Sequence, residues 1–217
     1  MGYSIAMWGQ TPTEESYEVN NLKSLERNKR PPTNLFLALL KYEDFRNKYI
    51  LRFCDFANVI FNIDKVDLLI NDYKDNYLDM LANSKVRWKG YDFESELEAF
   101  AAFKKDFAKT FDDIRTFYAE RPKYAFQHMK EFLELDSDLQ ELTIKKKGEG
   151  KIKINSIIPK FRDGKWVGEY FSGIPITITA IPSEKSKFKG WSGDVESEEK
   201  SITLEVNKEN KIKVDFE

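Results

Sequence analysis

Few side chains in this sequence have the type and spacing that catalytic chemistry requires. His128 is the only histidine and Cys54 the only cysteine of the 217 residues. One histidine and one cysteine exclude a two-histidine zinc site, an HExxH motif, a multi-cysteine metal site and an internal disulfide. We interpret His128, beside Met129 on a short helix, as a packing or surface residue. Cys54, next to an apolar stripe, is interpreted as a buried and inert thiol.

Aspartates are numerous, and several lie close enough in sequence for acid–base or metal chemistry to be considered. Two acids spaced three or four residues apart lie on the same face of a helix. The same residues also fall on the polar sides or at the ends of amphipathic helices, where acids keep the surface solvated. We interpret them as solvated surface residues: Asp64 with Asp67, Asp72 with Asp75 and Asp79, Asp112 with Asp113, and Asp136 with Asp138.

The basic residues form one local cluster, the run Lys145–Lys147 followed by Lys151 and Lys153. A charged strand edge that resists aggregation is the interpretation we favour, and a polyanion-binding surface is the alternative. The whole chain has 35 basic and 37 acidic side chains and a formal net charge of −2. This balance excludes the strong positive field that nonspecific nucleic-acid binding needs, so no nucleic-acid partner is predicted.

The elements that must position these residues change type along the chain. Helical periodicity runs from Asn34 to about residue 138, and Asp64 and Asp92 are the expected caps of two helices. Arg121-Pro122 is expected to end or kink the longest helix. The first thirty-odd residues are expected to be extended. The expected apolar helix faces are Phe45, Tyr49, Phe53, Phe56 and Ile60, then Val66, Leu69, Ile70, Tyr73, Tyr77 and Met80, then Leu97 to Phe117, and finally Phe126, Met129 and Leu133.

After Leu139 the apolar period falls to two, which indicates strands. Seven of the ten glycines follow residue 138, whereas 13 of the 17 phenylalanines precede residue 139. We place the boundary near Ser137 to Leu142. The sequence thus predicts an α+β protein, a helical part followed by a small all-β module of five or six strands. The expected strands carry Leu142 and Ile144, Ile152 and Ile154, Ile174 to Ala180, Ile202 to Val206, and Ile212 to Phe216.

The longest apolar stretch, Leu35–Leu40, is far shorter than the ~18 residues that cross a bilayer, so no membrane span is predicted. The N-terminus lacks the basic flank and long apolar core of a signal peptide. We therefore expect either a cytoplasmic chain or an internal piece of a longer protein.

The stretch from Asn34 to Phe61 resembles the spore-coat protein H (CotH) kinase family. A leucine-rich helix precedes Phe45-Arg46, Arg52 and Asp55-x-x-Asn58 in the family's order. Val86-Arg87-Trp88 is similar to the family's His-x-x-Arg-Trp ending, with Ser84 in place of the histidine. The resemblance implies that residues 34–138 are the helical, bundle-like C-terminal lobe of an atypical protein-kinase-like fold, and residues 1–33 the tail of its active-site region.

CotH proteins use ATP and a divalent metal to phosphorylate protein hydroxyls. Their ATP and metal residues lie upstream of the position of Met1, so the resemblance implies no catalytic, cofactor or metal residue in this chain. ATP and Mg would belong to an intact parent, a secreted or cell-surface bacterial protein whose upstream lobe would be this chain's partner. The alternative is a noncatalytic bacterial surface, adhesion or protein-interaction module.

Residues 139–217 resemble a divergent internalin-B-type bacterial repeat module. The matching segments are Gly168–Pro182 and Lys187-Phe-Lys-Gly-Trp-Ser-Gly193. The motif implies that Phe188 and Trp191 fill the β core while its glycines form turns. The alternative is a ligand-stacking platform for glycans that uses Trp166, Tyr170 or Trp191.

Overall fold

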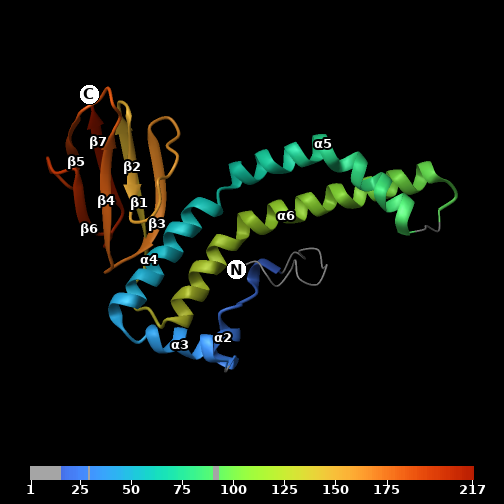
Figure 1. Ribbon diagram of the computed structural model, residues 1–217, viewed down its shortest axis with the longest axis horizontal. Coiled ribbons are helices and arrows are strands. Elements are labelled where there is room, and N and C mark those ends of the chain that lie inside the picture. Colours follow the sequence, from blue (N-terminus) through green and yellow to red (C-terminus); the bar gives the residue numbers. More distant parts are fainter. Residues whose placement is uncertain (1–15, 29, 90–92) are drawn as a thin grey trace. The chain divides into compact units, whose positions relative to one another are not determined.

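The computed structural model describes residues 16–28, 30–89 and 93–217, and its architecture is α+β, as the sequence predicts (Figure 1). The helical elements are η1 (Ser16–Glu18), α2 (Lys23–Arg27), α3 (Pro31–Leu39), α4 (Glu43–Ile60), α5 (Ile63–Lys89) and α6 (Glu96–Phe132). The strands are β1 (Leu139–Lys147), β2 (Gly150–Ile154), β3 (Lys165–Phe171), β4 (Pro175–Pro182), β5 (Phe188–Gly193), β6 (Ser201–Glu205) and β7 (Asn210–Phe216).

The chain forms two compact units that do not coincide with the two predicted parts. Unit 1 contains Phe61–Ala125, and therefore α5 and most of α6, together with residues 16–21. Unit 2 contains Leu22–Ile60 and Phe126–Glu217. The change from helix to strand does fall near Ser137 to Leu142, as expected. The compact division differs because α4 and the C-terminal end of α6 pack with the strands.

The first residues also differ from the expected extended segment. Their described part contains η1 and α2, and α3 begins at Pro31. Proline suits the first turn of a helix because its missing N–H has no intrahelical partner there. Residues 1–15, on which the rest of this expectation falls, lie outside the described residues.

Unit 1 is an antiparallel hairpin of α5 with the first part of α6. Ion pairs join the two helices along their length: Arg115 with Asp67 at 2.7 Å, Lys74 with Asp112 at 2.8 Å, Lys104 with Asp79 at 2.5 Å, and Lys85 with Asp106 at 3.5 Å. At the hairpin's far end, Ala82, Ala99 and Phe103 form a small buried cluster. Asp67, Asp79 and Asp112, which belong to the aspartate groups noted in the sequence, therefore each form an ion pair with a cation of the other helix.

The helix ends differ in detail from the expected ones. The N–H of Lys65 donates to Asn62 Oδ1 at 3.2 Å, so Asn62 rather than Asp64 caps α5. Asp92 lies outside the described residues, and the Ser95 hydroxyl accepts from the N–H of Glu98 at 3.2 Å at the start of α6. Pro122 does not end α6, which continues to Phe132. A proline removes only one ladder bond, and the flanking turns keep the helix continuous.

The apolar face expected for α5 is only partly buried. Val66 and Ile70 are buried, whereas Leu69, Tyr73, Tyr77 and Met80 are exposed. A helix in a two-helix hairpin has one neighbour within that hairpin, so only a narrow side of it is covered.

The strands of unit 2 form two sheets that pack face to face, with orders β3-β1-β7-β5 and β2-β4-β6. The β1–β7 pair is parallel and the other pairs are antiparallel. Consecutive strands β1 and β2 lie in different sheets, so the turn at Gly148 crosses between sheets instead of closing a hairpin. Alternate residues face inward and are buried, among them Leu142, Ile144, Ile152, Ile154, Ile176, Ile178, Ile212 and Val214.

Candidate functional site

Asp55 of α4 is the buried carboxylate of unit 2, with 1% of its surface exposed. Its Oδ1 accepts hydrogen bonds from Asn155 Nδ2 at 3.1 Å and from the Tyr170 hydroxyl at 2.9 Å. Its Oδ2 accepts from the N–H of Ser156 at 3.0 Å and from the Ser156 hydroxyl at 2.5 Å. Four donors therefore replace the water that this carboxylate would bind at the surface.

These four bonds connect α4 to both sheets. Tyr170 lies on β3 of the four-stranded sheet, whereas Asn155 and Ser156 follow β2 of the three-stranded sheet. Asn155 has a left-handed φ of 44° and exchanges two bonds with the backbone of Thr177, at 2.8 and 2.9 Å. Asn tolerates this conformation better than most residues. Burial, with the Asp55 charge as the next cause, holds the pKa of Tyr170 above its usual value, so its hydroxyl stays a donor.

Asn58, one turn after Asp55, covers the edge of the four-stranded sheet. Its Nδ2 donates to the Glu169 carbonyl at 3.0 Å, and the Glu169 N–H donates to its Oδ1 at 2.9 Å. The side-chain amide thus replaces a neighbouring strand for one residue of β3, which is an edge strand. A Cβ added at Gly168 would lie 2.3 Å from the Trp166 ring and 3.1 Å from Asn58 Cγ. A larger residue at position 168 would therefore displace Trp166 or α4.

The other residues of the CotH-like pattern are divided between the two units. In unit 2, Arg46 Nη2 donates to the Leu133 carbonyl at the end of α6, and the Phe45 ring packs edge-on against Phe36 at 6.2 Å. In unit 1, the Arg87 guanidinium lies over the exposed Trp88 ring at 5.1 Å. The resembling pattern therefore contributes residues to both units.

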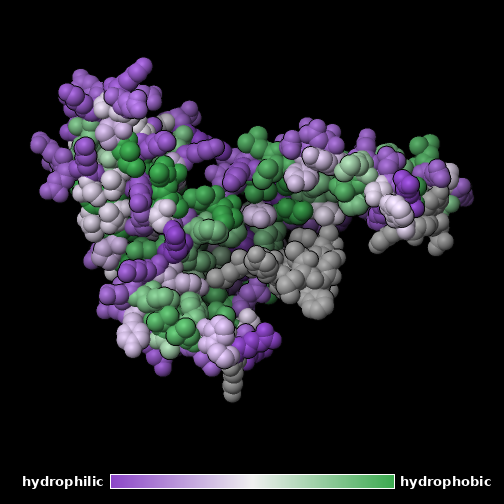
Figure 2. Space-filling view, in the orientation of Figure 1, coloured by the Kyte–Doolittle hydropathy of each residue, from purple (hydrophilic) through white to green (hydrophobic). Residues whose placement is uncertain are grey.

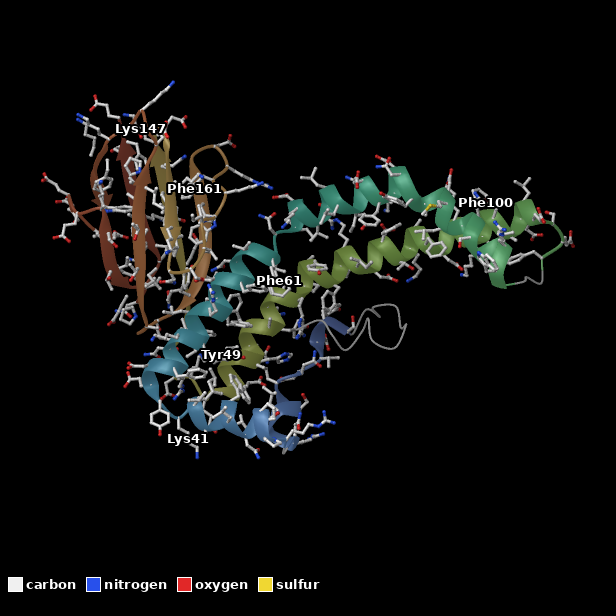
Figure 3. All side chains as sticks on the ribbon, in the orientation of Figure 1. Lys41, Tyr49, Phe61, Phe100, Lys147 and Phe161 are labelled. Atoms are coloured by element: carbon white, nitrogen blue, oxygen red, sulfur yellow. The ribbon has the colours of Figure 1, made fainter. Side chains whose placement is uncertain are left out.

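The Asp55 carboxylate forms part of the wall of a shallow pocket of about 550 Å³ in unit 2. Phe45, Tyr49 and Leu51 give this pocket an apolar side, and Lys48 and Arg52 place cations at it. Figure 3 labels Tyr49 on α4, whose ring packs against Phe36 at 5.0 Å and whose pKa is raised by burial. The pocket's carboxylate already accepts on both oxygens, so the residues lining it supply cations and an apolar wall.

A second pocket of about 440 Å³ lies beside the start of α4 in unit 2. Lys41, Glu43, Arg46, Glu134 and Asp136 are among the residues that line it. In the part of the chain that the structure describes, no group of three or more His, Cys, Asp or Glu side chains could hold a metal ion. No helix of the described ranges is long and apolar enough to cross a membrane.

The lone cysteine and most aromatic residues of the β module are buried, whereas Phe188 is half-buried. Burial raises the pKa of the fully buried Cys54 thiol to about 12. Trp191 is buried and donates its indole N–H to the Glu199 carbonyl at 2.9 Å, and Phe188 packs against it at 5.7 Å. Trp166 and Tyr170 are buried as well. The expected alternative of a glycan-stacking platform on Trp166, Tyr170 or Trp191 is wrong, because stacking needs an exposed ring face.

Comparison with known proteins finds no matching family model, no matching curated protein and no matching solved structure. Sequence reasoning singles out Asp55 and Asn58 only through the CotH resemblance, which does not indicate that they join α4 to the strands.

Two surfaces were missed or misjudged from the sequence. One is the exposed face of α5. The other is the outer face of the four-stranded sheet, where β1 is a central strand, so Lys145 does not lie at the edge expected for it.

Proposed function

We propose that the chain is a noncatalytic protein-interaction module that makes its contact through one face of α5. The α5 stripe consists of Leu69, Tyr73, Tyr77, Met80 and Trp88, spaced 4, 4, 3 and 8 residues apart along one helix face. Their exposed fractions are 51, 50, 42, 58 and 75% in that order. Several exposed apolar side chains aligned on one helix face are typical of a protein-binding site. This stripe is the observation that carries the proposal.

The composition of the α5 stripe also favours binding. Tyr, Trp and Met are enriched in protein interfaces because they bury a large area with few rotatable bonds or adapt to the opposing surface. Tyr73 and Tyr77 pack their rings together at 5.2 Å, so part of the stripe is preorganised. From Leu69 to Trp88 the helix rises about 28 Å at ~1.5 Å per residue, enough for a helix partner to lie along it. Figure 2 shows hydrophobic side chains reaching the surface along α5 and α6.

The charges of the hairpin support a second copy of the chain as the partner. Residues 63–76 and 106–120 hold eight acidic and four basic side chains, a net charge of −4. Residues 77–89 and 96–105, at the other end, hold three acidic and five basic side chains, a net charge of +2. Two copies of α5 packed antiparallel about a twofold axis would bring opposite charges together and place Leu69 near the partner's Trp88. Such an isologous contact needs only one surface patch.

Sedimentation velocity over a range of protein concentrations tests this proposal. We expect a reversible dimer whose dissociation constant rises about tenfold or more in Leu69→Glu, because the variant places a charge inside the contact. Leu68→Glu is the matched control, since Leu68 is an exposed leucine one residue away and off the stripe. A chain that stays monomeric at every concentration, or an equal effect of both variants, would contradict the α5–α5 contact.

The CotH resemblance supplies a second candidate, which the same stripe favours. In that hypothesis the chain is the C-terminal lobe of an atypical protein kinase, and the stripe contacts the upstream lobe of the parent protein. An in-frame coding region before Met1 with a lysine-bearing β lobe and paired aspartates would support it. For this chain alone we expect no saturable binding of ATP with Mg²⁺ in a calorimetric titration, and metal-dependent saturation would show that it holds nucleotide residues of its own.

A further inference from the structure

We propose that the outer face of the four-stranded sheet binds a linear chain of phosphate groups. The contact is the lysine row, which consists of Lys165 on β3, Lys145 on β1 and Lys213 on β7. Lys145 is the register partner of both Lys165 and Lys213, so the three residues lie side by side across adjacent strands. All three are exposed, whereas Ile144, Trp166 and Ile212 beside them in sequence are buried. The lysines therefore point away from the core.

This arrangement has an electrostatic cost. Like charges directly opposite each other on neighbouring strands repel, at a strand separation of about 4.8 Å. No ion pair found among the described residues involves any of the three lysines. Lys165 lies on the edge strand β3, but protection of a sheet edge does not explain Lys145 and Lys213, because β1 and β7 are both paired on their two sides. A bound anion would remove the repulsion.

The rest of the face limits the size of the ligand. Next to the lysine row, Lys147 at the end of β1 (Figure 3) faces Asp215 in register, and Lys211 forms an ion pair with Glu209 at 2.8 Å. At the opposite end of the face Glu141 and Glu169 are register partners, and burial together with the Glu141 charge raises the pKa of Glu169. The positive field therefore covers only a short strip that runs across the strands. This geometry suits a few consecutive phosphates and does not suit a long nucleic acid.

The residue types favour a ligand that is bound through its charge density and not through bidentate hydrogen bonds. The cations on β1, β3 and β7 are all lysines, and no arginine lies on these strands. Lysine binds as a hydrated point charge, whereas arginine is preferred where a carboxylate or phosphate group is held by two parallel bonds. Ser192, the β5 register partner of Lys213, extends the row with a hydroxyl. The surface is therefore suited to a ligand of high charge density, such as a chain of phosphate groups.

Calorimetric titration with inorganic tripolyphosphate at low salt tests the inference. We expect saturable binding that weakens as salt rises and falls about tenfold or more in the double variant Lys145→Gln/Lys213→Gln. The control Lys151→Gln/Lys153→Gln removes two lysines from the edge strand β2 of the other sheet, and it should change the affinity less than about twofold. The row variant should fold, because it removes repulsion, and its thermal midpoint should not fall.

Three results would overturn the inference: no saturable binding by the unchanged chain, an equal loss of affinity in both double variants, or equally tight binding of a short polyglutamate. The last result would show a surface that reads charge without preference for phosphate. Single-stranded DNA of the same charge could bind as tightly as tripolyphosphate, and longer DNA more tightly still. That result would show a nucleic-acid surface instead. All of these outcomes are independent of the α5 contact, which lies in the other unit.

Discussion

The Tyr170 hydroxyl donates to the Asp55 carboxylate at 2.9 Å across 115 positions of sequence, and this bond joins α4 to the four-stranded sheet. The same carboxylate holds Asn155 and Ser156 of the other sheet. Asp55 is therefore a structural centre of unit 2, and its removal should be felt by both sheets.

Replacing Asp55 by alanine leaves four buried or partly buried donors without their acceptor. We expect Asp55→Ala to lower the free energy of unfolding of unit 2 by about 3 kcal/mol or more, since each unpaired buried donor costs ~1–3 kcal/mol. Urea unfolding followed by tryptophan fluorescence measures this, because Trp166 and Trp191 lie in unit 2. Asp136→Ala is the control, since Asp136 is an exposed aspartate of the same unit. A loss as small as the control's would mean that the donors find water or other partners.

Tyr170→Phe tests the bond between the two residues directly. We expect a loss of about 1–2 kcal/mol from this variant alone, and a loss in the double variant Asp55→Ala/Tyr170→Phe that is smaller than the sum of the two. The same urea titrations supply all values for the cycle. Strict additivity would indicate that the two side chains do not interact in solution.

Gly168→Ala should destabilise unit 2 although its backbone needs no left-handed angle. The new Cβ would meet the Trp166 ring at 2.3 Å and Asn58 at 3.1 Å, so either Trp166 or α4 must move. We expect a loss of about 1–3 kcal/mol, in the range of other overpacked cores. Adding Asn58→Ala to Gly168→Ala should recover part of the lost stability only if the new Cβ displaces α4 and not Trp166. Thermal unfolding of Gly168→Ala, of the double variant and of Asn58→Ala alone checks this.

Cys54 should make unit 2 less stable at high pH. Burial raises the pKa of its thiol from 9.0 to about 12, so above pH 9 the unfolded chain loses this proton while the folded chain keeps it. The thiol's contribution is fully present below pH 9 and is lost as the pH rises through 12. At pH 10.5 we expect a loss of about 2 kcal/mol relative to pH 8.

Cys54→Ala provides the control, because lysines and tyrosines titrate in the same range. Between pH 8 and pH 10.5 this variant should lose less of its free energy of unfolding than the unchanged protein, and the difference should equal the contribution of the thiol. Urea midpoints at the two pH values measure it. In the unchanged protein, the thiol should also react with a disulfide reagent at pH 8 only after urea is added. Rapid reaction of the folded chain would contradict the burial of Cys54.

Arg121 is expected to hold residues 16–21 against α6 within unit 1. Its buried guanidinium donates to the carbonyls of Tyr17 at 2.6 Å and Val19 at 2.9 Å, and Tyr124 packs on Tyr17 at 5.5 Å. Arg121→Met keeps the length of the side chain and removes the donors. We expect faster amide hydrogen exchange in residues 16–21 and little change in the strands. Arg115→Met, which loses an exposed ion pair, is the control.

The periodicity of apolar residues was sufficient to predict the α+β class, the main helices and most strands. Helical and extended periods depend on local sequence, so α4, α5 and the strands with Ile152, Ile176, Ile202 and Ile212 could be placed from the sequence alone. The strands β3 and β5 were missed. Their alternation is interrupted by Gly168, Gly190 and Gly193, and a glycine contributes no side chain to the pattern.

Only the tertiary structure decided which apolar residues are covered and which polar residues meet. Leu69 and Ile70 look equivalent in sequence, but α6 covers the side of α5 that carries Ile70. Lys145, Lys165 and Lys213 are far apart in the chain and become neighbours because β1 pairs with both β3 and β7. Asp55 is buried on α4 because Tyr170, Asn155 and Ser156 supply it with donors from both sheets. The local pattern of apolar residues specifies whether a segment forms a helix or a strand. The neighbours of that helix or strand depend on strand order and packing, which no single segment encodes.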